Sequence, residues 1–428
     1  MEISELHKVF KDSSGISTDT RSISNGNLFF ALSGPNFNAN TFAKKALELG
    51  AIAAVVDHPD FALDNRYILV EDSLQSLQQL ASYHRQQLDC TIIAVCGSNG
   101  KTTSKELIAR VLSSTYNTFF TPGNFNNHIG VPLSLLMLSE EHEYAVIEMG
   151  ANHKGEHEIL CQIATPDFGI ITNNGKDHLE GFGSIEGVIE ANNELFEYLE
   201  AAQKAAFVNS NDSILMENSR NIGRILYGSD ELAMCDAQLM AAFPYTKVEL
   251  SFSNKKNPVS VTSQLFGSFQ KDNLALAACI GYYFDVEPDK IKAALEAYRP
   301  ANMRTQQMEW NDNEVLLDAY NANPSSMMAV LKDFSEFNHE HKALILGDML
   351  EMGDASFSEH EAVVDFIEQN TYDLVVLVGT EFARHQRKGM HSFETTALTK
   401  DWLLKQDLKG LSILIKGSRG LKLETLLT

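Results

Sequence analysis

Hydrophobic residues along the chain form short apolar runs that alternate with stretches of helical periodicity. The run Thr91–Cys96 is β-branched and apolar, which is typical of a buried strand, and apolar residues then recur at helical spacing from residue 107 to residue 112. Between them, the sequence GSNG (97–100) breaks both patterns. Residues 91–112 therefore predict a strand, a glycine-containing loop and a helix in direct succession.

The same alternation extends over most of the chain. Further strands are expected at 28–32, 51–57, 65–72, 144–150, 168–172, 205–209, 315–320, 342–349, 373–379 and 411–418. Helices are expected at 40–50, at 73–88 and directly after 286. Strands that alternate with helices indicate βαβ crossovers and mostly parallel sheets. The last four strands are apolar on both faces, which indicates helices on both sides of their sheet.

The length of 428 residues exceeds one ordinary hydrophobic core and predicts about three domains. A helix-like segment leads out of the first unit, and a proline-containing link follows the helix after 286. We therefore expect an α/β chain of three domains in series, at residues 1–85, 86–300 and 301–428.

Composition restricts the partners. The net charge of -23 argues against a nucleic acid or an anionic membrane, although a small anionic substrate in a locally basic pocket stays compatible. Five scattered cysteines form no C-x-x-C pair, so neither a zinc site nor a disulfide framework is indicated. We find no secretory signal pattern and no apolar run long enough to span a bilayer, and we expect a soluble cytoplasmic protein.

The loop after residue 96 has the chemistry of a phosphate site. Gly97 and Gly100 let backbone amides turn towards a ligand at a helix N-terminus. Lys101 could neutralise phosphate, and Thr102 could ligate magnesium. The spacing G-x-x-G-K-T is shorter than the full phosphate-loop pattern, whose first glycine falls at Val95. The alternative is a glycine-rich turn with an exposed lysine.

Two further candidates are expected on the same rim, because ligands of parallel sheets collect at the carboxyl ends of the strands. Glu148 ends an apolar run and could bind magnesium, although alone it reads as an ordinary strand-end acid. His178, in TNNGKDH, could ligate a metal or accept a proton, and a surface loop histidine is the alternative.

Two polar segments lie outside this rim. The sequence Asp19-Thr20-Arg21 could hold a polar or anionic group, with a solvated turn as the alternative. Lys416 and Arg419, in KGSRG, could bind phosphate or a carboxylate, and a simple turn is equally compatible.

Motifs from one end of the chain to the other resemble those of the Mur ligase family. They are STDTRSI, NLFFALSGPNFN, GSNGKTTSKE, TPGNFNNHIGVPLSLL, EMGANHKGE, TNNGKDHLEGFGS, DAYNANPSSM, LGDMLEMG and KGSRGLKLE. The NANP and LGDM-E-G signatures resemble the members that join D-alanyl-D-alanine to UDP-N-acetylmuramoyl-tripeptide. The resemblance implies a uridine-nucleotide-binding first domain, a central ATPase-like domain with a phosphate loop, and a Rossmann-like last domain that closes over the active site.

The resemblance also implies the reaction. ATP phosphorylates the terminal carboxylate of the tripeptide, the dipeptide amine attacks the acyl phosphate, and phosphate leaves. Because one anion attacks another in the first step, catalysis depends on positive charge and positioning. The implied cofactors are ATP and Mg²⁺, and we expect a monomer.

By the resemblance, each candidate residue acquires a role. The ATP-binding set is Gly97, Ser98, Asn99, Gly100, Lys101, Thr102, Thr103, Gln270, Asn273, Arg304, Asp318, Tyr320 and Asn321. The metal set is Thr102, Glu148 and His178, and Lys101 and His178 are the expected catalytic residues. The substrate set is Asp19, Thr20, Arg21, Lys416 and Arg419.

Two departures from the family pattern affect this transfer. Asn192 stands where members commonly carry a carbamylated lysine that helps to hold a second magnesium. We therefore expect that this metal is held more weakly, or with help from Glu190 or Glu194, and that activity needs no bicarbonate. Phe269 and Gln270 replace a histidine and an asparagine, and Phe269 can only stack or pack.

Other functions remain open at this point. A sibling ligase that adds a single amino acid is disfavoured by NANPSSM and the LGDM segment. A phosphate-loop ATPase or kinase would hydrolyse nucleotide without an acceptor amine. A nucleotide-binding protein without catalysis is motivated by Asn192.

Overall fold

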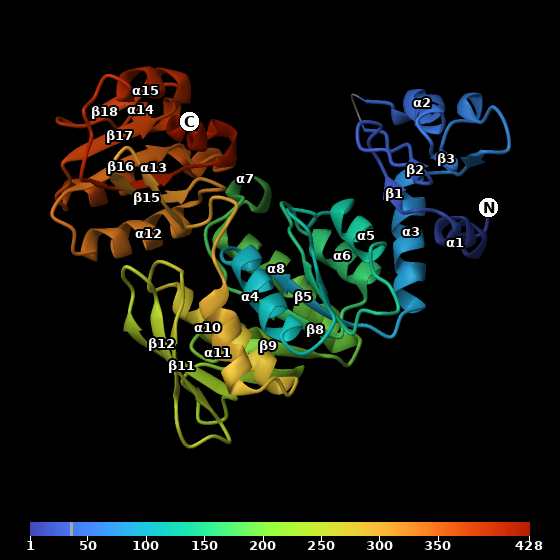
Figure 1. Ribbon diagram of the computed structural model, residues 1–428, viewed down its shortest axis with the longest axis horizontal. Coiled ribbons are helices and arrows are strands. Elements are labelled where there is room, and N and C mark those ends of the chain that lie inside the picture. Colours follow the sequence, from blue (N-terminus) through green and yellow to red (C-terminus); the bar gives the residue numbers. More distant parts are fainter. Residues whose placement is uncertain (35–36) are drawn as a thin grey trace.

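The computed structural model describes residues 1–34 and 37–428. Pro35 and Asn36, within the motif NLFFALSGPNFN, lie outside the described residues. The strands of the described residues form three sheets, which follow one another along the chain (Figure 1). These sheets occupy residues 16–69, 91–262 and 306–416. We propose domain boundaries near residues 85 and 300, and we refer to the N-terminal, central and C-terminal units accordingly.

The N-terminal sheet has four parallel strands in the order β1-β2-β3-β4. The strands are β1 (Ile16–Ser17), β2 (Leu28–Phe30), β3 (Ala53–Val56) and β4 (Tyr67–Leu69), and the helices are α1 (Ile3–Asp12), α2 (Ala43–Glu48) and α3 (Ser73–Gln86). The helix predicted at 40–50 is in fact two elements, because a 3₁₀ turn at Ala39–Phe42 precedes α2. Asn38 stabilises the start of this turn by accepting a hydrogen bond from the Asn40 amide.

The central sheet has nine strands in the order β13-β12-β11-β10-β9-β8-β5-β7-β6. The strands are β5 (Thr91–Cys96), β6 (Thr118–Phe120), β7 (Tyr144–Glu148), β8 (Phe168–Ile171), β9 (Ala205–Asn209), β10 (Gly223–Tyr227), β11 (Cys235–Ala241), β12 (Lys247–Phe252) and β13 (Val259–Thr262). The helices are α4 (Lys101–Ser113), α5 (Gly130–Leu135), α6 (Glu156–Ala164), α7 (Leu179–Phe182), α8 (Ile185–Ala201), α9 (Ser213–Asn218), α10 (Gln270–Tyr283) and α11 (Pro288–Ala297).

Strands β5 to β10 pair in parallel, as the alternation predicts. An antiparallel extension of β11, β12 and β13, which the sequence pattern did not reveal, widens the sheet. In β12, buried and partly or fully exposed residues alternate, and the buried face packs against α10. Such half-buried strands carry a weaker apolar signal than the fully buried β5.

The C-terminal sheet has six strands in the order β14-β15-β19-β16-β17-β18. The strands are β14 (Gln306–Trp310), β15 (Asn313–Asp318), β16 (Lys342–Gly347), β17 (Leu374–Val378), β18 (His391–Phe393) and β19 (Ser412–Lys416), and the helices are α12 (Pro324–Glu336), α13 (Ser356–Glu368), α14 (Thr380–Ala383) and α15 (Thr396–Leu403). Strand β14 is antiparallel to β15, and the other pairs are parallel. A hydrophobic cluster lies on each face, which confirms the predicted two-sided burial.

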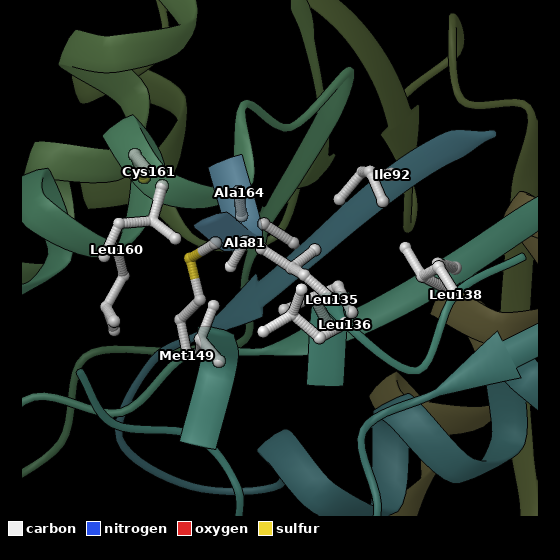
Figure 2. Close-up of a cluster of buried hydrophobic side chains, with 14 of the residues drawn as sticks. Ala81, Ile92, Leu135, Leu136, Leu138, Met149, Leu160, Cys161 and Ala164 are labelled. Atoms are coloured by element: carbon white, nitrogen blue, oxygen red, sulfur yellow. The ribbon is translucent and has the colours of Figure 1, made fainter. Parts of the chain in front are cut away.

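Helix α3 connects the N-terminal and central units through a shared core. Its residues Leu77, Leu80 and Ala81 belong to one hydrophobic cluster that runs from the N-terminal sheet into the central unit. Figure 2 shows Ala81 among apolar side chains that include Leu135 of α5 and Leu160 and Ala164 of α6. The described residues contain no helix that is both long enough and apolar enough to span a bilayer.

Candidate active site

The loop between β5 and α4 depends on its two glycines. Gly97 has φ 115°, and a Cβ there would lie 2.4 Å from Thr172 Oγ1. Gly100 has φ 82°, and a Cβ there would lie 2.8 Å from Asn273 Oδ1. Both positions therefore require glycine for conformation and for space. The N-terminus of α4, which begins at Lys101 directly after the loop, provides amides suited to an anion.

Asn173, which follows β8, braces this loop. Its carbonyl accepts a hydrogen bond from the Ser98 amide at 2.9 Å, and its side-chain oxygen accepts one from the Asn99 amide at 3.2 Å. Its Nδ2 donates to the Asn99 carbonyl at 2.9 Å. The Lys101 ammonium donates to the carbonyls of Gly97 and Ser98. The loop and its lysine are thus ordered by protein contacts alone.

Glu148 ends β7 as a buried carboxylate, 2% exposed. Its Oε1 accepts a hydrogen bond from Asn126 Nδ2 at 2.9 Å. Its Oε2 lies 3.5 Å from Lys105 Nζ and has no hydrogen-bond partner among the described residues. A buried carboxylate oxygen without a hydrogen bond fits a position for a hard cation. Sequence reasoning missed Lys105, although it lies one helical turn beyond Lys101.

His178 lies at the start of α7 and faces the C-terminal unit. Its Nδ1 lies 2.5 Å from Glu351 Oε2, which belongs to the loop after β16. The hydrogen bond from His178 lowers the pKa of Glu351. Glu351 was also missed, because only its motif, LGDMLEMG, was noticed in the sequence.

One cleft of about 670 Å³ collects most of the predicted residues from two units. The central unit contributes Ser98, Asn99, Gly100, Lys101, Thr102, Thr103, Glu148, His178, Gln270 and Asn273. The C-terminal unit and the link before it contribute Arg304, Asp318, Tyr320, Asn321, Lys416 and Arg419, together with Glu351. Gly97 lies outside this lining.

The C-terminal wall of the cleft is rich in cations, but most are already engaged. The Arg304 guanidinium lies 3.9 Å from the centre of the Tyr320 ring. Lys416 is buried, and its Nζ lies 2.5 Å from Asp318 Oδ2. Arg419 pairs with a neighbouring carboxylate, Glu424, at 2.7 Å. Lys416 therefore holds Asp318 in place and does not extend freely into the cleft.

Gln270 and Asn273 share the first turn of α10. Asn273 Nδ2 donates to Gln270 Oε1 at 2.8 Å, and Asn273 Oδ1 accepts from Ser104 Oγ at 3.0 Å. This places both amides beside the phosphate loop. Phe269 lines the cleft and packs on the core of the C-terminal unit, in keeping with the packing role expected of it.

Asn192 is buried in α8, and its Nδ2 donates to Asn174 Oδ1 at 2.8 Å. The expectation that Glu190 or Glu194 helps to hold a second metal is wrong for this arrangement. Glu190 pairs with Lys154, and Glu194 accepts hydrogen bonds from the amides that begin α6. Neither lines the cleft. Both carboxylates satisfy nearby donors on α6 or on the loop before it.

The structure does not bring Asp19, Thr20 and Arg21 into the lining of this cleft. Asp19 and Arg21 pair with each other at 2.6 Å on an exposed turn. The hydrogen bond from Arg21 lowers the pKa of Asp19 to about 2. These residues lie in the N-terminal unit, at the turn after β1.

No group of three or more His, Cys, Asp and Glu side chains in residues 1–34 and 37–428 could by itself hold a metal. A cation at Thr102, Glu148 or His178 would therefore take further ligands from phosphate and water. Magnesium usually binds in this way, through one or two protein groups together with substrate phosphates.

Comparison with known proteins assigns the class. The family model of the Mur ligase middle domain matches residues 95–281, and that of the Mur ligase glutamate ligase domain matches residues 303–419. The chain belongs to the Mur ligase family.

Within the family, the chain is 34% identical over 423 residues to the UDP-N-acetylmuramoyl-tripeptide--D-alanyl-D-alanine ligase of Bacillus subtilis, covering 96% of this chain and 91% of that protein. It is also 34% identical to the Escherichia coli protein of the same name, covering 96% and 92%.

Solved structures agree with this assignment. The MurF crystal structure from Acinetobacter baumannii has a TM-score of 0.86 at 29% identity, over 99% of this chain and 97% of that one. The MurF ligase from Thermotoga maritima in complex with ADP has a TM-score of 0.86 at 25% identity, over 98% and 97%.

Proposed function

We propose that this protein is an ATP-dependent ligase that joins D-alanyl-D-alanine to UDP-N-acetylmuramoyl-tripeptide and so forms the UDP-muramoyl-pentapeptide of peptidoglycan synthesis. The observation that carries the proposal is one cleft between two units, with the phosphate loop on one wall and Asp318, Lys416 and Arg419 on the other. The names of the relatives point to the same reaction.

In the first step, the phosphate loop holds the β- and γ-phosphates of ATP against the backbone amides at the start of α4 and the Lys101 ammonium. A carboxylate oxygen of the tripeptide attacks the γ-phosphorus, and the bond to the ADP oxygen breaks. The products are an acyl phosphate and ADP. Lys101 compensates the charge of the two approaching anions, and the cleft walls hold them in line.

Thr102, Glu148 and His178 are the residues that would hold Mg²⁺, which supplies positive charge to the phosphate oxygens when bound. Glu148 fits because its Oε2 is buried and accepts no hydrogen bond, while the carboxylate is fixed in place through Oε1. We further assign adenine contacts to Gln270 and Asn273, and contacts with ATP across the cleft to Arg304, Asp318, Tyr320 and Asn321.

In the second step, the amine of D-alanyl-D-alanine attacks the carbonyl carbon of the acyl phosphate. The tetrahedral intermediate then expels phosphate, and the amine proton is lost to solvent. We assign Arg419 and Lys416 to the wall that faces the substrates, with Lys416 acting through its contact with Asp318. We assign Asp19, Thr20 and Arg21 to the uridine nucleotide.

We also propose that the protein acts as a monomer in the cytoplasm, where ATP and nucleotide-linked precursors are available. Sedimentation at equilibrium should then give the chain mass of 47.5 kDa. A dimer mass would contradict this part of the proposal.

An omission series tests the reaction. Phosphate release is measured with ATP, Mg²⁺, UDP-N-acetylmuramoyl-tripeptide and D-alanyl-D-alanine, and each component is left out in turn. We expect release only in the complete mixture, and the pentapeptide as the product. Because Asn192 has no amine to carbamylate, depletion of carbon dioxide should leave the rate unchanged. Release without the dipeptide would indicate an ATPase instead.

Replacement of the phosphate-loop lysine tests the site. Lys101→Ala removes the ammonium beside the phosphates, and we expect kcat to fall by at least about a hundredfold. The control is Lys247→Ala, which removes an exposed lysine on β12, away from the cleft. Near-normal ligation by Lys101→Ala would mean that the phosphate site has been misplaced.

A further inference from the structure

Two residues with uncommon backbone conformations face each other where the central and C-terminal units meet. His178 has φ 45° and Glu351 has φ 63°. Left-handed conformations are uncommon for residues other than glycine, and they tend to persist where the surrounding structure holds them. Here the two side chains are in contact, with Nδ1 and Oε2 2.5 Å apart.

The loop that carries Glu351 is seated on α7. The Glu351 carbonyl accepts a hydrogen bond from the Glu180 amide at 3.2 Å. Gly353 has φ 51°, and a Cβ there would lie 3.3 Å from Glu180 Cα, so the loop approaches the helix closely. Figure 1 shows α7 reaching from the central unit to the C-terminal unit at this point. Contact between the two units thus places the Glu351 carboxylate beside His178.

The carboxylate beside Nδ1 determines which ring nitrogen is available to a cation. When Nδ1–H donates to a carboxylate, Nε2 carries the lone pair and can ligate a cation. A carboxylate in this position also orients the ring and raises its basicity as a ligand. Asn192 of α8 donates a hydrogen bond to Asn174 and is neutral, so this residue supplies no charge to a cation.

We propose that Glu351 is a positioning residue for His178, so that docking of the C-terminal unit fixes the imidazole with Nε2 available to a divalent cation. This inference rests on the proposed function, from which it takes that His178 holds a cation. It follows that cation binding at His178 and docking of the C-terminal unit favour each other, since linked equilibria are reciprocal.

Manganese is a suitable probe, because its unpaired electrons report a coordinated imidazole nitrogen through electron spin-echo envelope modulation. The sample is the full chain with Mn²⁺, a non-hydrolysable ATP analogue and UDP-N-acetylmuramoyl-tripeptide. We expect ¹⁴N modulation in the wild type and its loss in Glu351→Ala. The Mn²⁺ concentration for half-saturation of the affected site should rise by about 10- to 100-fold.

Three variants make the result specific. Glu351→Gln keeps an oxygen that accepts the Nδ1–H bond and should retain the modulation. His178→Ala should abolish it, which identifies the nitrogen. Glu394→Ala removes an exposed carboxylate of the same unit outside the cleft and should change nothing.

Modulation that is absent from the wild type, or that persists unchanged in Glu351→Ala, would overturn the proposal. Loss in both Glu351→Ala and Glu351→Gln would also overturn it, because the charge and not the hydrogen bond would then matter. The omission series on the wild type is run first. A failed ligase assignment would appear there as release independent of the dipeptide, whereas a failed positioning role leaves that series intact.

Discussion

The central unit meets its two neighbours through junctions of different character. The N-terminal junction is a continuous apolar core along α3, which includes Leu77 and Leu80. At the C-terminal junction, four residues of the central unit pack with the apolar core of the C-terminal unit: Leu179, Phe243, Phe266 and Phe269. Several polar contacts accompany this apolar one. These contacts are Asn323 with Asn99, Lys176 with Ser325 and Glu359, His178 with Glu351, and Ser268 with Asp333.

The two junctions are therefore expected to differ in how easily the units they join can separate. An apolar core resists separation, because its surfaces would be exposed to water. Polar contacts exchange with water at little cost, so a junction that includes many of them is expected to separate more easily than a continuous apolar core. The cleft lies at the second junction, where the phosphate loop is ordered within the central unit and Glu351 arrives from the C-terminal unit.

The largest expected effect on stability is at the apolar junction. Leu80→Ala removes a fully buried side chain from α3 and should lower the free energy of unfolding by about 2–5 kcal/mol. Urea denaturation measures this value. The control, Leu398→Ala, truncates an exposed leucine on α15 and should have almost no effect. A small loss in Leu80→Ala would show that α3 is not part of a common core.

Features that depend on residues close together in the sequence could be predicted, whereas contacts between distant residues could not. Strand β5 was predicted with its observed bounds, because Thr91–Cys96 is a local pattern. The placement of Glu148 and His178 beside the phosphate loop followed from a general rule about parallel sheets. The expected strands at 342–349 and 411–418 also formed, with ends trimmed by a few residues.

What the sequence could not give was the contacts made by docking. Nothing near His178 in the chain indicates that Glu351 will lie against it, because the two belong to different units. In the sequence, Lys105 cannot be told from an exposed helical lysine. In the structure it is buried beside Glu148. The expectation for Glu190 and Glu194 relied on their closeness to Asn192 in sequence. Both side chains instead bond to groups outside the cleft.

A smaller effect is expected at the polar junction. Lys176 Nζ lies 2.5 Å from Glu359 Oε1, and the lysine side chain is 51% exposed. Lys176→Ala should therefore cost at most about 1 kcal/mol, and added salt should weaken the pair. A double-mutant cycle with Glu359→Gln isolates the coupling. A coupling as large as the Leu80→Ala loss would remove the contrast between the junctions.

The smallest effect concerns pH at the N-terminal junction. Burial lowers the pKa of His84 below 6.5, and His84 Nε2 lies 2.9 Å from the Leu138 carbonyl oxygen. As pH falls through 6.5, the unfolded chain binds a proton that the native state binds less readily, so stability falls. His7 Nε2 lies 3.1 Å from His84 Nδ1, and the pKa of His7 is also lowered, mainly by burial.

The measurement is the free energy of unfolding between pH 7.5 and about 5. His84→Gln, which keeps an amide donor for Leu138, should show a shallower decline than the wild type. The same slope in both proteins would mean that His84 is not responsible.

Distances between spin labels, measured by pulsed electron double resonance, test most directly whether the two junctions differ. Exposed positions suit the labels: Lys44→Cys with Glu200→Cys across the N-terminal junction, and Glu200→Cys with Lys388→Cys across the C-terminal one. The five native cysteines are buried. We predict one narrow distribution for the first pair in all conditions. For the second pair, we predict a broad distribution that narrows when a non-hydrolysable ATP analogue, Mg²⁺ and UDP-N-acetylmuramoyl-tripeptide are added. Equally narrow and unresponsive distributions for both pairs would contradict the account.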